Sequence, residues 1–553
     1  MGLRLISKAT AALALACLSA ALAGCPSPAP VANADAGAPP VALPDSDNPI
    51  DLAVRDAFLE VRHVPERASD AELCRRLFAD LVGRYPTLDE VDADCVGRDV
   101  DEIARELQGR EEYLVVSERH WRDRFRTTDV TVSWRYLKGL YALVDALHRG
   151  ELGYEDFAME ALAHPGFLLT EVAADDRARR AFEVFLGRSA TDAEAVDIGN
   201  LFRPWVPEVA PDPDFPYMFS IEARLYPFLC EPIASCEAEL LGGAKLDFPG
   251  TPSFEVIRYE ALSDAQRDVL KEPGRLFVRQ PFFFEAAADE ILDRLLDWDD
   301  GARVARTPGT LFPDVREAVA RYLRDTGDVP GAERLVLTSW LYTQSAEMEG
   351  ADPEAPVFTS GPVKPALAEV WLDSALRFSA PFSGHDPRYS DGFPYFLIYD
   401  ALGQGTITLE QAEEDFQRLN DMREDRMPLW MNEGYLQPDY RYTFLVRLIG
   451  GAPGFDSERQ EATGLAFAFQ QESLAELVCL PEIAAGAIPE GDLDVGGVMR
   501  HQMRALFARE PTAEEVEAFE VAAEACEGAS CTPLGRVNAI CVALLGSAEM
   551  LFY

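Results

Sequence analysis

Short amphipathic stretches separated by Gly- and Pro-containing breaks run along most of this chain, and they predict helices. Four apolar side chains at helical spacing line one face of residues 71–81: Leu73, Leu77, Phe78 and Leu81. Gly83 would end this helix, and Thr87 would begin the next one, with Glu90 at the capping-box spacing. The first unit is therefore predicted to be a helix, a tight turn and a capped helix.

The same unit recurs along the chain. LFADLVGRYPTLDE (77–90) is followed by FEVFLGRSATDAE (182–194) and LFAREPTAEE (506–515), with a looser copy at 444–453. These recurrences are too unevenly spaced for a solenoid. We therefore expect an all-α, multi-helix body built from recurring helix–turn–helix units.

A second recurrence relates the two halves of the chain. DALHRGELGYE (145–155) matches DALGQGTITLE (400–410), 255 residues further on. We interpret residues 51–203 and 364–553 as two related helical domains. Residues 204–363 between them would be an insert that is rich in loops at first and then helical.

The first 24 residues have the pattern of an export signal. Arg4 and Lys8 precede an almost unbroken run of small and apolar residues at 9–21, too short to span a bilayer. The run ends in LAGC, which resembles the bacterial lipoprotein box, where a peptidase cleaves before an acylated Cys. Residues 1–24 would then be a signal peptide and Cys25 the lipid anchor. The alternative is an ordinary secretory signal that leaves Cys25 as a free thiol.

The residues after Cys25 predict where the body lies. Pro26, rather than Asp, resembles the sorting pattern of outer-membrane lipoproteins, facing the periplasm or the surface. Residues 25–50 are Pro/Ala-rich without hydrophobic periodicity, as in a tether. No later stretch approaches 18 consecutive apolar residues, so we expect an extracytoplasmic body anchored to the membrane only through Cys25.

The charge of the chain excludes some partners. It has 95 Asp+Glu against 50 Lys+Arg and a net charge of −45, which becomes −47 when Arg4 and Lys8 leave with the signal peptide. Sequence-independent binding to nucleic acid needs clustered cations, so no nucleic-acid partner is expected. Binding to anionic lipid through a basic face is excluded on the same grounds.

Eight cysteines remain besides Cys17 and Cys25, an even number in an oxidising compartment, which favours disulfides. Metal binding is the competing use, but no CxxC occurs and no His lies near a Cys pair in the sequence. Proximity favours four pairs: Cys74–Cys95, Cys230–Cys236, Cys479–Cys541 and Cys526–Cys531.

Two segments resemble a known family. DLVGRYPTLDEV (80–91), with EY at 112–113 and HW at 120–121, is similar to bacterial exported domains of unknown function that accompany planctomycete-type cytochrome c modules. The ending ALLGSAEMLFY (543–553) looks like the close of the same domains. The resemblance implies an all-helical, surface-associated protein beside a redox or polysaccharide-handling partner, and it supplies no catalytic residues. The chain lacks the CxxCH haem-attachment motif of such modules.

Two weak calcium-loop candidates begin at Asp145 and Asp400. Each has Asp at position 1 and Gly at position 6, but Leu147 and Leu402 occupy position 3, and too few charged oxygens remain for calcium. A turn between two helices explains both segments. The acidic string at 297–300 has the same simpler explanation, as a helix end and turn. We therefore expect no metal and no cofactor.

Candidate catalytic groups are sparse. The six histidines form neither HxH nor HExxH, and no GxSxG occurs. His385, in FSGHDPRY, is the most reactive-looking, yet adjacent Ser, His and Asp in one loop cannot easily form a triad. His120 beside Trp121 fits core packing, and so do the aromatic runs at 215–219 and 282–284, which could otherwise bind sugar or protein. No catalytic residue is assigned.

The sequence therefore favours a non-enzymatic function. The preferred hypothesis is an outer-membrane lipoprotein that acts as a surface binding or assembly component, with an unknown protein or glycan partner. One alternative is a haem-free accessory to an electron-transfer partner. Another is a hydrolase of envelope or extracellular polysaccharide, which would need two carboxylates roughly 5–10 Å apart in a cleft.

Overall fold

A computed structural model gives the architecture of the chain. It describes residues 41–126, 134–168, 173–202, 245–246, 254–255, 268, 270–296, 312–346, 357–364, 366–378, 475, 479, 488, 494–524 and 532–551. Helices dominate these residues, so the predicted all-α fold is confirmed. Two short strands, β1 (Lys245–Leu246) and β2 (Phe254–Glu255), pair in antiparallel fashion. Within these ranges, no helix has the length and apolar character needed to cross a bilayer.

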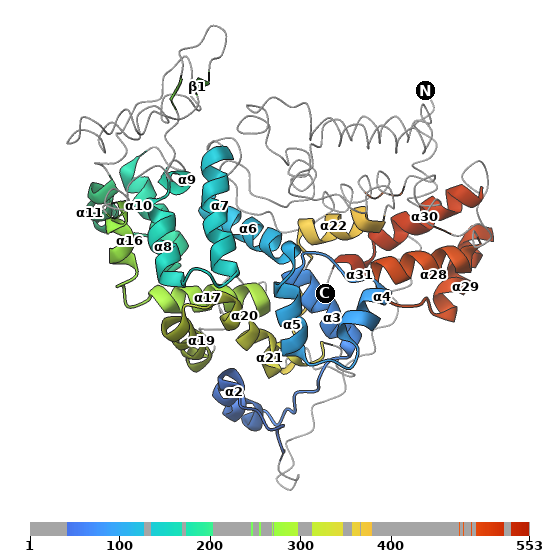
Figure 1. Cartoon of the computed structure of the whole chain (residues 1–553). Coiled ribbons are helices and arrows are strands. Elements are labelled where there is room, and N and C mark those ends of the chain that lie inside the picture. Colours follow the sequence, from blue (N-terminus) through green and yellow to red (C-terminus); the bar gives the residue numbers. More distant parts are fainter. Residues whose placement is uncertain are drawn as a thin grey trace.

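The helices of the N-terminal part follow one another with short connections (Figure 1). They are α2 (Pro49–Glu60), α3 (Asp70–Leu81), α4 (Leu88–Glu90), α5 (Val100–Gln108), α6 (Glu111–Phe125), α7 (Trp134–His148), α8 (Tyr154–Ala163), α9 (Pro165–Leu168), α10 (Ala174–Leu186) and α11 (Asp192–Phe202).

The later helices fall into two groups. The first group is α16 (Glu272–Phe277), α17 (Phe283–Leu296), α19 (Pro313–Thr326), α20 (Val329–Leu337) and α21 (Trp340–Thr343). The second group is α22 (Ala368–Phe378), α28 (Val495–Leu506), α29 (Ala513–Glu524), α30 (Pro533–Leu545) and α31 (Ala548–Leu551).

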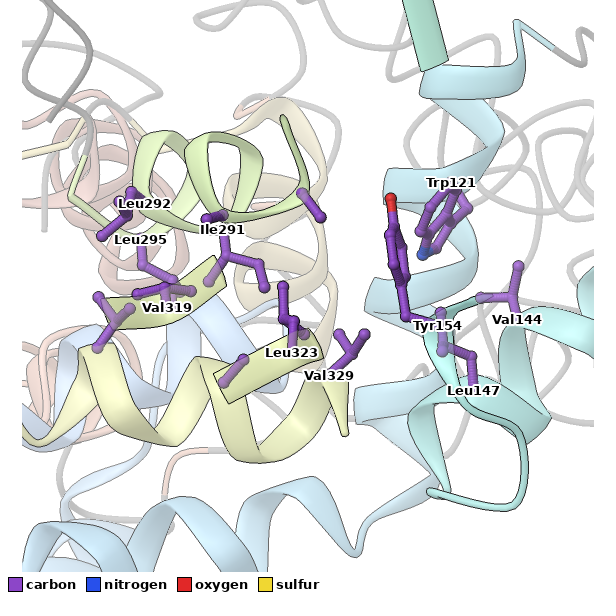
Figure 2. Close-up of a cluster of buried hydrophobic side chains, with 14 of the residues drawn as sticks. Trp121, Val144, Leu147, Tyr154, Ile291, Leu292, Leu295, Val319, Leu323 and Val329 are labelled. Atoms are coloured by element: carbon purple, nitrogen blue, oxygen red, sulfur yellow. The ribbon is translucent and has the colours of Figure 1, made fainter. Parts of the chain in front are cut away.

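The main hydrophobic core joins α2–α11 to α16–α21. Figure 2 shows Ile291 and Leu295 of α17 facing Val319 and Leu323 of α19, and all four side chains are buried. This core crosses the predicted boundary at residue 203. The domain limits remain predictions, but the helical second part of the insert packs with the N-terminal helices.

A smaller core is formed by the C-terminal helices and α22, and it also takes Ala79 and Tyr85 from the N-terminal part. Tyr85 is one residue that connects the two parts. Its backbone N–H donates to Ser374 Oγ at 2.8 Å, and its hydroxyl donates to the carbonyl of Met550 at 3.1 Å. The guanidinium of Arg75 lies 3.5 Å from the centre of the Tyr85 ring.

Two disulfides are present in the described residues. Cys74 on α3 bonds to Cys95, and Cys479 bonds to Cys541 on α30, each with 5.7 Å between Cα atoms. Both are pairs that the sequence favoured. Five other cysteines with predicted roles lie outside the described residues: Cys25, Cys230, Cys236, Cys526 and Cys531.

The recurring helix–turn–helix unit is confirmed at three of its four predicted positions, and the copy at 444–453 lies outside the described residues. Each of the three copies contains a two-pronged ion pair between an Arg and the Glu six residues later. The pairs are Arg84–Glu90 (3.0 and 2.8 Å), Arg188–Glu194 (3.0 and 2.7 Å) and Arg509–Glu515 (2.9 and 2.7 Å). We call this unit the Arg–Glu clamp.

The clamp also caps its second helix. In every copy the Glu carboxylate accepts from the backbone N–H of the Thr at the helix start, at 2.7–2.9 Å. The Glu N–H donates back to the Thr hydroxyl at 3.2–3.3 Å, which completes a capping box. The residue before the Arg turns the chain with a left-handed φ, 75° at Gly83, 59° at Gly187 and 55° at Ala508.

Candidate functional site

Glu333 on α20 is a carboxylate that is fully buried in the core and has several polar partners there. Its Oε2 accepts from the Tyr113 hydroxyl at 2.6 Å and from Gln108 Nε2 at 3.0 Å, and its Oε1 pairs with the Arg294 guanidinium. The Tyr113 hydroxyl also lies 2.8 Å from His148 Nδ1. Helices α5, α6 and α17 thus meet α20 at one carboxylate, and α7 joins them through Tyr113.

The hydrogen bonds fix where the protons of this network lie. Trp121 Nε1 can only donate, and it lies 3.2 Å from His148 Nε2, so that nitrogen is the acceptor. In a neutral imidazole His148 Nδ1 then carries the proton and donates to the Tyr113 oxygen. The Tyr113 hydroxyl in turn donates to Glu333. We call the six residues Gln108, Tyr113, Trp121, His148, Arg294 and Glu333 the Glu333 network.

The pKa values agree with this arrangement. Burial lowers the pKa of His148 to about 4, so its imidazole is neutral at pH 7. Burial alone would raise the pKa of Glu333, but Arg294, His148 and the hydrogen bonds from Tyr113 and Gln108 together outweigh it, and the pKa is lowered. Burial and the nearby Glu333 raise the pKa of Tyr113 well above 10. The network therefore holds one ion pair, one neutral His and one neutral Tyr.

A second buried cluster lies close by. Asp80 on α3 accepts from the Tyr342 hydroxyl at 2.8 Å and pairs with the ammonium of Lys364. Lys364 Nζ also donates to the carbonyl of Leu295 at 3.2 Å. Asp80 and Lys364 are 4% and 3% exposed, so this ion pair is almost completely removed from water.

A third polar group lies at the edge of the core. His120 Nε2 donates to Glu290 Oε1 at 2.7 Å, and Arg124 pairs with the other Glu290 oxygen. Burial, together with the charges of Arg294 and Arg124, lowers the pKa of His120 well below 6.5. His120 is therefore neutral at pH 7 and fixed by its carboxylate partner. Trp121 beside it is buried, as the sequence predicted.

These groups are directed at one another, and this determines what chemistry they can perform. A general acid or base must reach a substrate proton. Glu333 and Tyr113 are fully buried, and His148 is only 4% exposed. Their hydrogen bonds join helices that are distant in sequence, and a buried polar network of this kind favours one arrangement of a core over others. In the described part of the chain, no three His, Cys, Asp or Glu side chains are placed to hold a metal ion.

The structure places several of the sequence candidates. Asp145 lies in the last turn of α7, and Gly150 turns the chain into α8 with a φ of 70°. Leu147, at the third loop position, is fully buried, so this segment is a turn between two helices. Phe283 and Phe284 are buried in the core, whereas Phe282 is 63% exposed.

The remaining candidates lie outside the described residues: Asp400, His385 and the segments 215–219 and 297–300.

The sequence analysis missed the residues of the Glu333 network. A signal was present, because Glu333 lies in VPGAERLVL among the positions that the helix period assigns to the buried face. A charged residue on an apolar face needs a partner. Arg294 occurs in the same way between Ile291 and Leu295, but nothing local pairs it with a residue 39 positions away.

Comparisons of the chain with family models, with curated proteins and with solved structures give no match.

Proposed function

We propose that this protein is an outer-membrane lipoprotein whose helical body binds or assembles with another envelope molecule and does not catalyse a reaction. The observation that carries the non-enzymatic part is the inward direction of the buried ionisable groups. Glu333 and Asp80 have cationic and hydrogen-bonding partners within the core, and Glu290 at its edge is held by His120 and Arg124. These three carboxylates of the described residues are thus engaged in holding helices together.

The lipid anchor follows from the sequence. LAGC at 22–25 supplies the acylation site, and residues 26–48 lie between Cys25 and α2. The two disulfides fit an oxidising compartment outside the cytoplasm. A net charge of −47 after signal removal keeps the body soluble and repels it from other acidic surfaces.

The anchor is tested by metabolic labelling with an alkyne analogue of palmitate in a bacterium with an outer membrane. We expect the full chain to be labelled and to fractionate with the outer membrane, and Cys25→Ala to lose both properties. Cys17→Ala is the matched control, because this cysteine lies in the signal peptide and should leave labelling unchanged. Equal labelling of the Cys25→Ala variant would refute the anchor.

The binding role is tested by crosslinking the labelled lipoprotein in intact cells and purifying it through a C-terminal tag. We expect a defined protein or glycan to co-purify with the full chain. Recovery of a cytochrome would favour an accessory to electron transfer. Release of sugars from isolated envelope polysaccharide by the purified protein would contradict the non-enzymatic proposal, and recovery of nothing above an unrelated lipoprotein would contradict the binding role.

A further inference from the structure

An amine and a carboxyl group lie in direct contact where the two hydrophobic cores meet. Lys364 Nζ donates to Asp80 Oδ1, and the two side chains are only 3% and 4% exposed. Ala79, before Asp80 on α3, packs in the smaller core, whereas Leu81 after it packs in the main core. The pair thus joins positions that are 284 residues apart in the sequence.

The groups around this pair hold both the nitrogen and the carboxyl group in place. Lys364 Nζ also donates to the carbonyls of Leu295 at 3.2 Å and Arg294 at 3.5 Å. The second carboxylate oxygen of Asp80, Oδ2, accepts from the Tyr342 hydroxyl at 2.8 Å. The nitrogen is therefore directed at one oxygen of the carboxyl group, while a hydrogen-bond donor holds the other.

Burial disfavours two separate charges at this position. A buried ion pair loses the hydration of both ions, and their mutual attraction offsets this loss only in part. Arg294, whose charge also reaches Asp80, is itself balanced by Glu333. In water an amide is hydrolysed because the solvent stabilises the ionised amine and carboxylate that result. A core that excludes water removes this advantage, so an uncharged amide is favoured over the ion pair here.

The contact between the two groups also favours the rate of amide formation. Well-oriented groups within one molecule react as though one were present at an effective concentration of about 10⁵–10⁸ M. A donor that holds the oxygen on which negative charge develops lowers the barrier further. The Tyr342 hydroxyl is in this position, because it donates to Asp80 Oδ2 and not to the oxygen that contacts Lys364.

We propose that Asp80 and Lys364 form an intramolecular isopeptide bond. A proton passes from the Lys364 ammonium to Asp80 Oδ1, which leaves a neutral amine beside a neutral carboxylic acid. The amine lone pair attacks Asp80 Cγ, and the Tyr342 hydroxyl stabilises the negative charge that develops on Oδ2. A second proton of the amine leaves with Oδ1 as water. One N–C bond forms and one C–O bond breaks, and nothing is oxidised or reduced.

The bond would hold the two parts of the molecule together covalently. It joins α3 to the segment that leads into α22, and a reducing agent does not break it, in contrast to the two disulfides. It does not depend on the lipid anchor, so the failure of either proposal leaves the other standing.

The test is mass spectrometry of tryptic peptides from the full, exported chain. Trypsin releases residues 77–84, which contain Asp80, and residues 335–377, in which Pro365 protects Lys364 from cleavage. We expect these two peptides to be joined, with a mass lower than their sum by one water. A digest without reducing agent that contains the Cys74–Cys95 disulfide shows that α3 has reached its native pairing. Recovery of 77–84 mainly as a linear peptide from such a sample would overturn the proposal and leave an ion pair.

Lys364→Arg is the matched control, because it keeps the cation but has no nucleophilic amine. We expect its 77–84 peptide to be linear and its far-ultraviolet circular dichroism spectrum to equal that of the wild type. On a reducing, denaturing gel the wild type should migrate ahead of this variant, because the closed loop makes the unfolded chain more compact. Equal migration of the two proteins would contradict the bond.

A second variant tests the hydroxyl that holds Asp80 Oδ2. Tyr342→Phe keeps the buried ring and removes only the donor, so we expect mainly the linear 77–84 peptide and an unchanged circular dichroism spectrum. Joined peptides at the wild-type yield in Tyr342→Phe would refute the part of the mechanism that assigns charge stabilisation to this hydroxyl.

Discussion

The three Arg–Glu clamps provide an internal comparison, because one geometry occurs at different depths. The Arg84–Glu90 pair is 9% and 18% exposed, whereas Arg188–Glu194 is 42% and 36% exposed. We consider replacing each Arg by Met, which keeps an apolar stem of similar length and removes the guanidinium. Each Arg also lies over a Phe ring within 5.8 Å, so the loss of that contact is common to all three variants.

The expected loss follows from burial. Removing Arg84 leaves the poorly solvated Glu90 without two charge-assisted hydrogen bonds, which should cost about 2–3 kcal/mol of unfolding free energy. Removing Arg188 leaves Glu194 in water, and we expect no resolvable change. Arg509 is 36% exposed but also holds Glu549 at 2.7 Å, so after screening by solvent its loss should cost about 1 kcal/mol.

The assay is urea unfolding of the mature chain, followed by tryptophan fluorescence with a common slope for all variants. The order of destabilisation should be Arg84→Met, then Arg509→Met, then Arg188→Met. A loss for Arg188→Met as large as that for Arg84→Met would refute the reasoning. It would mean that the clamp acts by holding the turn locally and that desolvation of the carboxylate does not matter.

Three further predictions concern the buried groups. Glu333→Gln leaves Arg294 buried without its counter-charge and should lower the free energy of unfolding by about 3–5 kcal/mol. The double variant Glu333→Leu/Arg294→Met removes both charges and should recover most of this loss in the same urea assay. Burial raises the pKa of Asp51 to about 6, so the free energy of unfolding should fall as pH rises from about 4 to 6. The free energy of unfolding of Asp51→Asn should therefore rise by up to about 3 kcal/mol relative to that of the wild type between pH 4 and pH 7. A difference between the two proteins that does not change with pH would contradict this. Removing the Cys74–Cys95 disulfide, which closes 21 residues, should cost about 3 kcal/mol by chain entropy, seen as a lower unfolding midpoint than that of the wild type without reducing agent and as a smaller difference once both proteins are reduced.

Features that depend on neighbouring residues were predictable from the sequence. The apolar stripe of α3, the Thr87 cap and the turn at Gly83 are all local, and the structure confirms them. The helical spacing expected in the second part of the insert is also present, as α17 (Phe283–Leu296) and α19 (Pro313–Thr326).

The long-range features were not predictable, because they depend on which helices meet. The sequence indicates that Thr87 and Glu90 form a capping box, but the Arg six residues before the Glu was overlooked, although the same spacing occurs in all three copies. The contact between Tyr113 and Glu333 joins positions 220 residues apart. One sequence contains no signal that would select this pair over other buried polar residues.

The docking of α2 has a consequence for the order of folding. Asn48 Nδ2 donates to the Leu335 carbonyl at 2.8 Å, and the Trp340 N–H donates to Asp51 Oδ1 at 2.6 Å. Helix α2 therefore completes its packing only after nearly 300 later residues have been added to the chain. Until then the apolar face of α2 lacks α19, the helix on which it packs. Because the closure of such a long loop is slow, chaperones have their greatest opportunity to bind during this interval.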